Sequence, residues 1–113
     1  MLSETYTKAH YHVIKIKEVL HLTSDINELD TIVEQLLDNK ALHIAVHFMD
    51  GSYLCSQTGA VIVRCWENIK EREGTLALIN VNKDILDFLK VIDIDSLIKL
   101  YDSEKDLEAS FVK

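Results

Sequence analysis

The chain contains no proline, three glycines and two cysteines among its 113 residues. It also has no Gly/Ser-rich linker and no internal repeat, and its length is that of one domain. Three scattered glycines cannot form the Gly-rich loop that holds the phosphates of a nucleotide, so no bound cofactor is expected. Cys55 and Cys65 provide no disulfide framework and fit a reducing cytoplasm.

Basic residues are scarce as well. The chain has 12 Lys and Arg residues and 19 Asp and Glu residues, which gives a net charge of −7. Nucleic-acid binding needs concentrated positive charge, so this composition argues against a nucleic-acid partner and against docking on an anionic membrane. No apolar run reaches the roughly 18–20 residues that span a bilayer, and the polar N-terminus resembles no secretory signal. We therefore expect an acidic cytoplasmic protein that does not insert into a membrane; its oligomeric state stays open, with a dimer among the alternatives.

Metal binding and catalysis both lack a convincing set of residues. His43 and His47 share one face of an expected strand, but the strand rise separates them by about 13 Å, too far to hold one ion. Cys55 has no base beside it in the sequence, and Ser52 and Thr58 belong to no GxSxG-like elbow. We expect no metal site, no catalytic residue and no enzymatic activity.

The hydrophobic pattern predicts alternating strands and helices. Residues 1–9 are expected to be a loose end and residues 10–113 to form one folded domain. An apolar residue at every second position predicts strands, and apolar residues three and four apart predict helices. The expected strands cover residues 12–17, 19–22, 42–48, 75–81 and 97–101. One helix is expected to begin at Gly59, and three others after the capping residues Asp25, Asn82 and Ser103. The helix after Ser103 is expected to include Phe111.

Residues 59–72 are the ambiguous part of this pattern. Ala60–Val63 is rich in β-branched residues, and local propensity alone favours a strand there. However, Ile62, Cys65 and Ile69 share one helical face, and the polar tail that follows them ends in a glycine suited to a helix C-terminus. We therefore predict a helix, and the resulting order is β-β-α-β-α-β-α-β-α. Such alternation implies a largely parallel sheet covered by helices.

Three local features, in this order, resemble the STAS domain, the family of bacterial anti-sigma factor antagonists. The first is the capped helix LTSDINELDTIVEQLLDN. The second is a strand, a short loop, a D-S-S-G-L-like motif, a helix and a glycine that starts the next strand. The ungapped match places Gly59 on the motif glycine and Gly74 on the later glycine, with the family's spacing between them. The third is GTLALINVNKDILDFLKVIDIDSLIKLYDSEKDLEAS, which resembles the C-terminal third of such domains. The resemblance covers about residues 10–111. It implies an α/β fold: a single STAS-like domain with a mostly parallel mixed sheet of four or five strands and about four helices packed on it.

The resemblance also implies a function. In this family the dephosphorylated domain binds an anti-sigma kinase and frees a sigma factor, and phosphorylation of a Ser or Thr beside the motif glycine breaks the complex. A phosphate adds about −1.5 to −2 charge at the contact surface, which explains the effect. The chain is thus expected to be a non-enzymatic protein-binding module of signal transduction and transcription regulation. The alternative is a structural STAS subunit of a stress-signalling complex or a lipid-transport ATPase.

The chain departs from the family at the phosphorylated position. The ungapped match places Ser56 on the motif aspartate, Gln57 on the phosphorylated residue and Thr58 on its neighbour. Gln57 has no hydroxyl, so it cannot accept a phosphoryl group. The switch is then either lost or moved to Ser56 or Thr58, the two candidate phosphoacceptors. For Thr58, capping of the following helix is the simpler interpretation.

The expected partner-binding surface comprises the 50–59 loop, the start of the following helix and the neighbouring 23–25 loop. Gln57 would supply both a hydrogen-bond donor and an acceptor to an anti-sigma factor, a kinase-like protein or an ATPase subunit. The candidate partner-binding residues are Ser24, Asp50, Ser52, Tyr53, Ser56, Gln57, Thr58 and Gly59.

Overall fold

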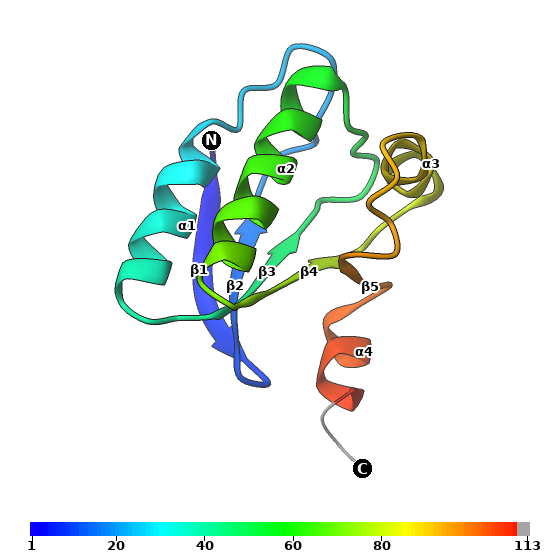
Figure 1. The fold of residues 1–113 in the computed structure, drawn as a ribbon. Coiled ribbons are helices and arrows are strands. Elements are labelled where there is room, and N and C mark those ends of the chain that lie inside the picture. Colours follow the sequence, from blue (N-terminus) through cyan, green and yellow to red (C-terminus); the bar gives the residue numbers. More distant parts are fainter. Residues whose placement is uncertain (111–113) are drawn as a thin grey trace.

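The computed structural model describes residues 1–110 and shows a five-stranded sheet with four helices (Figure 1). Phe111, expected in the last helix, lies outside the described residues. The strands are β1 (Ser3–Lys8), β2 (Tyr11–Ile16), β3 (His43–His47), β4 (Thr75–Ile79) and β5 (Lys99–Tyr101); the helices are α1 (Glu28–Asp38), α2 (Ser56–Glu71), α3 (Lys83–Val91) and α4 (Glu104–Ala109).

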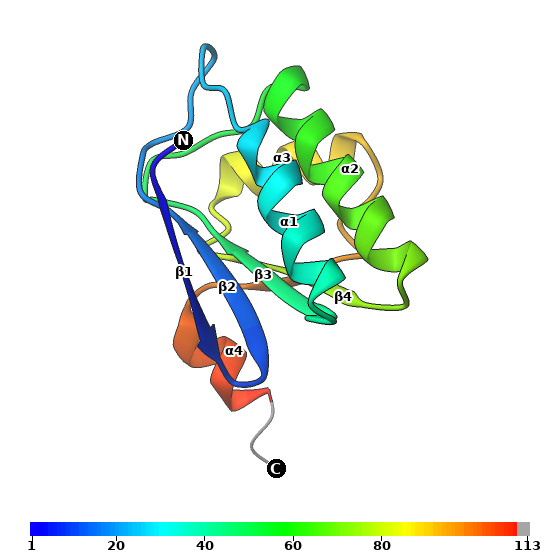
Figure 2. The same cartoon turned by 90° about the vertical axis from the view of Figure 1, so that its left-hand side faces the viewer.

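The sheet order follows the sequence, β1-β2-β3-β4-β5. The β1–β2 pair is antiparallel, and every other neighbouring pair is parallel. Figure 2 shows α1 and α2 on one face of the sheet and α4 on the other. Alternate strand residues serve two cores: Ile14 and Val46 pack with α1, α2 and α3, whereas Val13 and Ala45 pack with Leu107 of α4. The mixed, mostly parallel sheet predicted from the sequence is confirmed.

The N-terminal segment corrects the expectation of a loose end. Residues 3–8 form β1, which pairs with β2 along its whole length. Ala9 and His10 both have positive φ and form the two-residue turn of this hairpin. Conversely, the short strand expected at residues 19–22 is absent, because this segment forms an irregular connection between β2 and α1. The polar sequence of β1 hid the strand, since it lacks a regular apolar alternation.

The first helix begins later than its expected cap. The Asp25 carboxylate accepts hydrogen bonds from the backbone and side-chain nitrogens of Asn27, at 2.9 and 2.8 Å, instead of capping with Glu28. Two other caps form as predicted: Asn82 accepts from the amide of Ile85, and Ser103 accepts from the amide of Asp106. Residues 59–72 are helical as predicted, although α2 starts at Ser56.

The two glycines that carry the family resemblance are both sites of close packing. A Cβ atom on Gly59 would lie 2.2 Å from the Phe88 ring of α3, and one on Gly74 would lie 2.3 Å from the Leu42 carbonyl oxygen. Gly59 thereby lets α2 approach α3, and Gly74 lets the end of α2 approach the start of β3. Both glycines have a steric reason to be there.

Helix α4 is fastened to the sheet by one carboxylate. Glu104 accepts hydrogen bonds from Tyr6 and Lys8 of β1 and pairs with Nδ1 of His47 at 2.5 Å. Burial raises the pKa of Glu104, but the hydrogen bonds from Tyr6, His47 and Lys8 outweigh it and hold this pKa below its usual value. Together with the buried Leu107, this contact connects the C-terminal helix to β1 and β3.

Candidate functional site

Three connections meet at the edge of the sheet where the parallel strands end. They are residues 17–27 after β2, residues 48–55 after β3 and residues 80–82 after β4. In open α/β sheets, this edge is where ligands and partners usually bind. The central connection, residues 48–55, lies between the other two and leads directly into α2.

Ser52 and Tyr53 of the central connection hydrogen-bond to the first connection. The buried Ser52 hydroxyl accepts from the amide of Leu20 at 3.0 Å. The amide of Tyr53 donates to the carbonyl of Leu20 at 3.1 Å, and the Tyr53 hydroxyl accepts from the amide of Leu22 at 3.0 Å. Leu20 and Leu22, which lie in no helix or strand, thus bond through their backbone to the neighbouring connection, whereas the backbone of His21 bonds to Ser24 of its own segment.

Two asparagines join the central connection to the third one. The side-chain nitrogen of Asn80 donates to the Phe48 carbonyl at 2.9 Å and to the Asp50 carboxylate at 2.7 Å. The side-chain nitrogen of Asn82 donates to the Ser52 carbonyl at 2.7 Å, while its oxygen caps α3. Asn80 has a positive φ, which asparagine tolerates better than most residues. Residues 48–55 are therefore held from both sides.

Helix α2 begins with a reciprocal cap between Cys55 and Thr58. The Thr58 hydroxyl accepts from the Cys55 amide at 2.9 Å and donates to the Cys55 carbonyl at 3.3 Å. Hydrogen bonds from the backbone and hydroxyl of Thr58 lower the pKa of the Cys55 thiol. The expectation that Thr58 is the N-cap residue is corrected: Cys55 occupies that position, and Thr58 closes the box from the helix's third residue.

The structure divides the predicted partner-binding residues into two groups. Asp50, Ser56 and Gln57 are exposed, and Tyr53 is half-buried. The other four, Ser24, Ser52, Thr58 and Gly59, are buried. Their expected place on the contact surface is corrected: the hydroxyls of the three Ser and Thr residues bond inside the protein, and Gly59 packs on Phe88.

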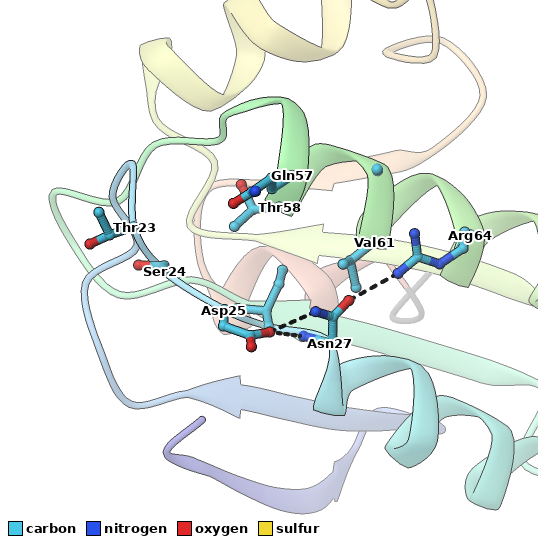
Figure 3. A pocket seen from close by; sticks show the side chains of 10 residues that line it. Thr23, Ser24, Asp25, Asn27, Gln57, Thr58, Val61 and Arg64 are labelled. Carbon is cyan, nitrogen blue, oxygen red and sulfur yellow. Dashed lines mark hydrogen bonds between the residues drawn. The ribbon is translucent and has the colours of Figure 1, made fainter.

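A polar hollow lies beside the exposed first turn of α2, between that turn and the segment before α1 (Figure 3). Its volume is about 390 Å³. Its lining residues are Thr23, Ser24, Asp25, Ile26, Asn27, Gln57, Thr58, Ala60, Val61 and Arg64.

Arg64 and Asn27 were missed by the sequence reasoning. Arg64 donates to the Asp30 carboxylate at 3.0 and 2.9 Å and to the Asn27 side-chain oxygen at 3.2 Å, so it joins α2 to α1. In the sequence, both residues resemble ordinary solvated surface residues. Their contact joins positions 37 apart, so no local pattern indicates it. The hollow thus exposes amide, hydroxyl, carboxylate and guanidinium groups, which can hydrogen-bond to the polar side chains of another protein.

Within residues 1–110, no cluster of three or more His, Cys, Asp or Glu side chains has the arrangement of a metal site. His47 pairs with Glu104, and the ring of His43 packs on Tyr11 with centroids 5.8 Å apart. None of the helices in this part of the chain has the length and apolar character needed to cross a membrane.

Neither family models nor curated proteins match the sequence, whereas solved structures do. A crystal structure of a candidate anti-sigma factor antagonist from Thermotoga maritima, TM1081, aligns with a TM-score of 0.75 at 18% identity, over 98% of this chain and 95% of that one. The NMR structure of TM1081 gives a TM-score of 0.77 at 16% identity, over 98% and 89%. An anti-sigma-factor antagonist (STAS) domain protein of Planctomyces limnophilus gives 0.62 at 21% identity, over 98% of each chain.

The chain has the STAS fold. The fold inferred from the sequence resemblance is thereby confirmed over nearly the whole chain. In this fold, the turn that carries Gln57 opens α2 at the edge where the three connections meet.

Replacing two serines of this region should separate its structural and exposed positions. We expect Ser52→Ala to lower the free energy of unfolding by about 1–3 kcal/mol, because it leaves the buried Leu20 amide without an acceptor. Ser56→Ala, at an exposed position four residues later, should change it by no more than about 0.5 kcal/mol. Urea unfolding measures the stability of both variants. An equal loss of unfolding free energy in the two would contradict the structural role of the Ser52 hydrogen bond.

Proposed function

We propose that this STAS domain is a non-enzymatic regulatory module that binds a protein partner through the first turn of α2. The partner is an anti-sigma factor or a related kinase-type protein, and the setting is control of transcription in the bacterial cytoplasm. The observation that carries the proposal is the placement of Ser56 and Gln57: both are exposed, on a turn whose preceding connection is fastened on two sides.

A fastened turn favours binding because less conformational freedom is lost when the partner arrives. The hydrogen bonds of Ser52 and Tyr53 hold the chain that leads into α2, and the Cys55–Thr58 cap fixes its first turn. Gln57 and the neighbouring polar hollow then present donors and acceptors at fixed positions. This arrangement gives specificity through geometry and hydrogen bonding, without a chemical step.

The fold adds support of a different kind. The similar solved structures include a candidate anti-sigma factor antagonist and an anti-sigma-factor antagonist domain protein. These likenesses at 16–21% identity concern the fold, so the partner class is our proposal. The acidic character of the chain, at net charge −7, further favours a partner whose contact surface is basic.

We further propose that the usual phosphorylation switch is absent. Gln57 takes the place of the phosphorylated residue. Of the two candidate phosphoacceptors, Thr58 is 1% exposed and bonded to Cys55, whereas Ser56 is exposed. A kinase could reach Ser56 without unfolding the turn, and it would have to break the cap to reach Thr58. Any residual switch would therefore act at Ser56.

The contact surface can be tested with Gln57→Ala. We expect this variant to weaken binding to the native partner by about tenfold, the loss of one good polar contact. Its melting temperature should stay nearly unchanged, because Gln57 is exposed. The partner is first recovered by pull-down from the native cell, and calorimetry or surface plasmon resonance then compares the variants.

Glu71→Ala, at an exposed position in the last turn of α2, is the matched control and should bind as the wild type does. Equal binding of the wild type and Gln57→Ala would refute the proposed surface. Recovery of a transport ATPase or a large stress-signalling assembly, without a free anti-sigma factor, would instead assign the chain to the structural alternative.

The absence of the switch has its own test. Incubation with ATP and the cognate kinase should leave the protein largely unmodified, because position 57 has no hydroxyl. Intact-mass spectrometry detects the addition of one phosphate. Stoichiometric phosphate that disappears in Ser56→Ala would show that the switch has moved by one residue, contrary to the proposal.

A further inference from the structure

The free edge of β1 offers a second surface, remote in sequence from α2. β1 is the outermost strand of the described sheet, and Figure 2 shows no helix crossing in front of it. Glu4, Thr5 and Thr7 are exposed along this strand. An edge strand presents backbone donors and acceptors that can pair with another strand.

The hairpin register fixes which backbone groups of β1 point outward. The amide of Lys17 donates to the carbonyl of Leu2 at 2.8 Å, so Leu2 belongs to the set of residues bonded to β2. Alternate residues of an antiparallel strand bond to the same neighbour, so that set continues along the strand with every second residue. The amides and carbonyls of Ser3, Thr5 and Thr7 therefore point away from β2, toward the free edge.

Only a few registers let two copies of this edge pair by a two-fold axis, because outward residues must lie opposite outward residues. One of them places Tyr6 opposite Tyr6 of a second copy and Thr5 opposite Thr7, so each threonine pair is hydrogen-bonded. The same register places Glu4 opposite Lys8 twice. An axis at Thr5 would instead place Glu4 opposite Tyr6, and an axis at Glu4 would place two carboxylates face to face.

Charge thus selects one of the registers that the backbone geometry permits. Glu4, Tyr6 and Lys8 lie on one face of the strand, and Glu4 and Lys8 fall in non-hydrogen-bonded pairs, whose Cα atoms approach to about 4.5 Å. Within one chain, Glu4 already pairs with Lys17 at 3.4 Å, and Lys8 pairs with Glu104 and Glu108 at 3.2 Å each. Pairing across the two-fold axis would join these ion pairs into a row of alternating charges.

We propose that two copies of this chain associate through antiparallel pairing of their β1 strands, centred on Tyr6, to form one continuous ten-stranded sheet. The interface is isologous, so each Glu4–Lys8 contact occurs twice. The other registers leave these charges mismatched, so the same residues that favour this pairing also disfavour indiscriminate edge association. The proposed partner-binding turn of α2 is not part of this interface, and the two proposals stand independently.

A charge exchange tests the register. Sedimentation equilibrium over a range of protein concentrations, at about 0.15 M salt, should show a reversible dimer of the wild type. Glu4→Lys and Lys8→Glu should each weaken dimerisation by about tenfold, because each places two like-charged pairs across the axis. The double variant Glu4→Lys with Lys8→Glu should regain most of the wild-type affinity, because opposite charges again face each other.

The double variant also separates contacts between chains from contacts within one. Inside a single chain it places like charges beside Lys17 and Glu104, so a purely intramolecular role would make it the worst of the three variants. A double variant that dimerises no better than the single variants would overturn the proposal. A wild type that stays monomeric up to about 1 mM, where even a weak edge contact would populate the dimer, would overturn it as well.

Thr5→Pro gives a second test that spares the charges. The backbone amide of Thr5 points toward the free edge. Proline at this position therefore removes a hydrogen-bond donor of the proposed interface without removing one that is bonded to β2. We expect Thr5→Pro to abolish the dimer with little change in melting temperature, whereas Thr5→Val, which keeps the amide, should dimerise as the wild type does. Dimerisation of a folded Thr5→Pro protein at wild-type affinity would contradict the proposed pairing.

Discussion

The buried Ser52 holds together the connections at the edge of the sheet where the parallel strands end. Its hydroxyl accepts from the Leu20 amide, and its carbonyl accepts from the side chain of Asn82. The same residue therefore connects the segment after β2 with the segment after β4. An unmade hydrogen bond at a site with 0% exposure is costly, so these contacts hold the connection that leads into α2 in one conformation.

Under the proposed function, the fixed connection leads to a turn whose position 57 has no hydroxyl to phosphorylate. In a switchable domain, the first turn of this helix must bind a partner and also accept a phosphate. Here Gln57 provides a hydrogen-bond donor and an acceptor at that turn, but its side chain has no hydroxyl that could be phosphorylated. The buried Thr58 serves the helix cap. Under the proposed function, this turn would recognise its partner continuously, and control would come from the abundance or availability of the partner.

Local patterns predicted much of the fold, and long-range contacts accounted for what they missed. The caps at Asn82 and Ser103 and the helical face of residues 59–72 were readable, because the interacting residues lie within a few positions. β1 was missed because a polar edge strand has no buried face to reveal it. Ser52 and Arg64 were misjudged for a related reason, since their partners lie 32 to 37 positions away.

Amide hydrogen exchange measures the rigidity of the functional edge most directly. If the connection after β3 is fastened as described, the amides of Leu20 and Tyr53 should exchange with protection approaching that of the Val46 amide in the central strand β3. The two residues lie outside helices and strands, so this protection would come from the contacts across the edge. Exchange of Leu20 and Tyr53 as fast as in an unstructured peptide would contradict the account.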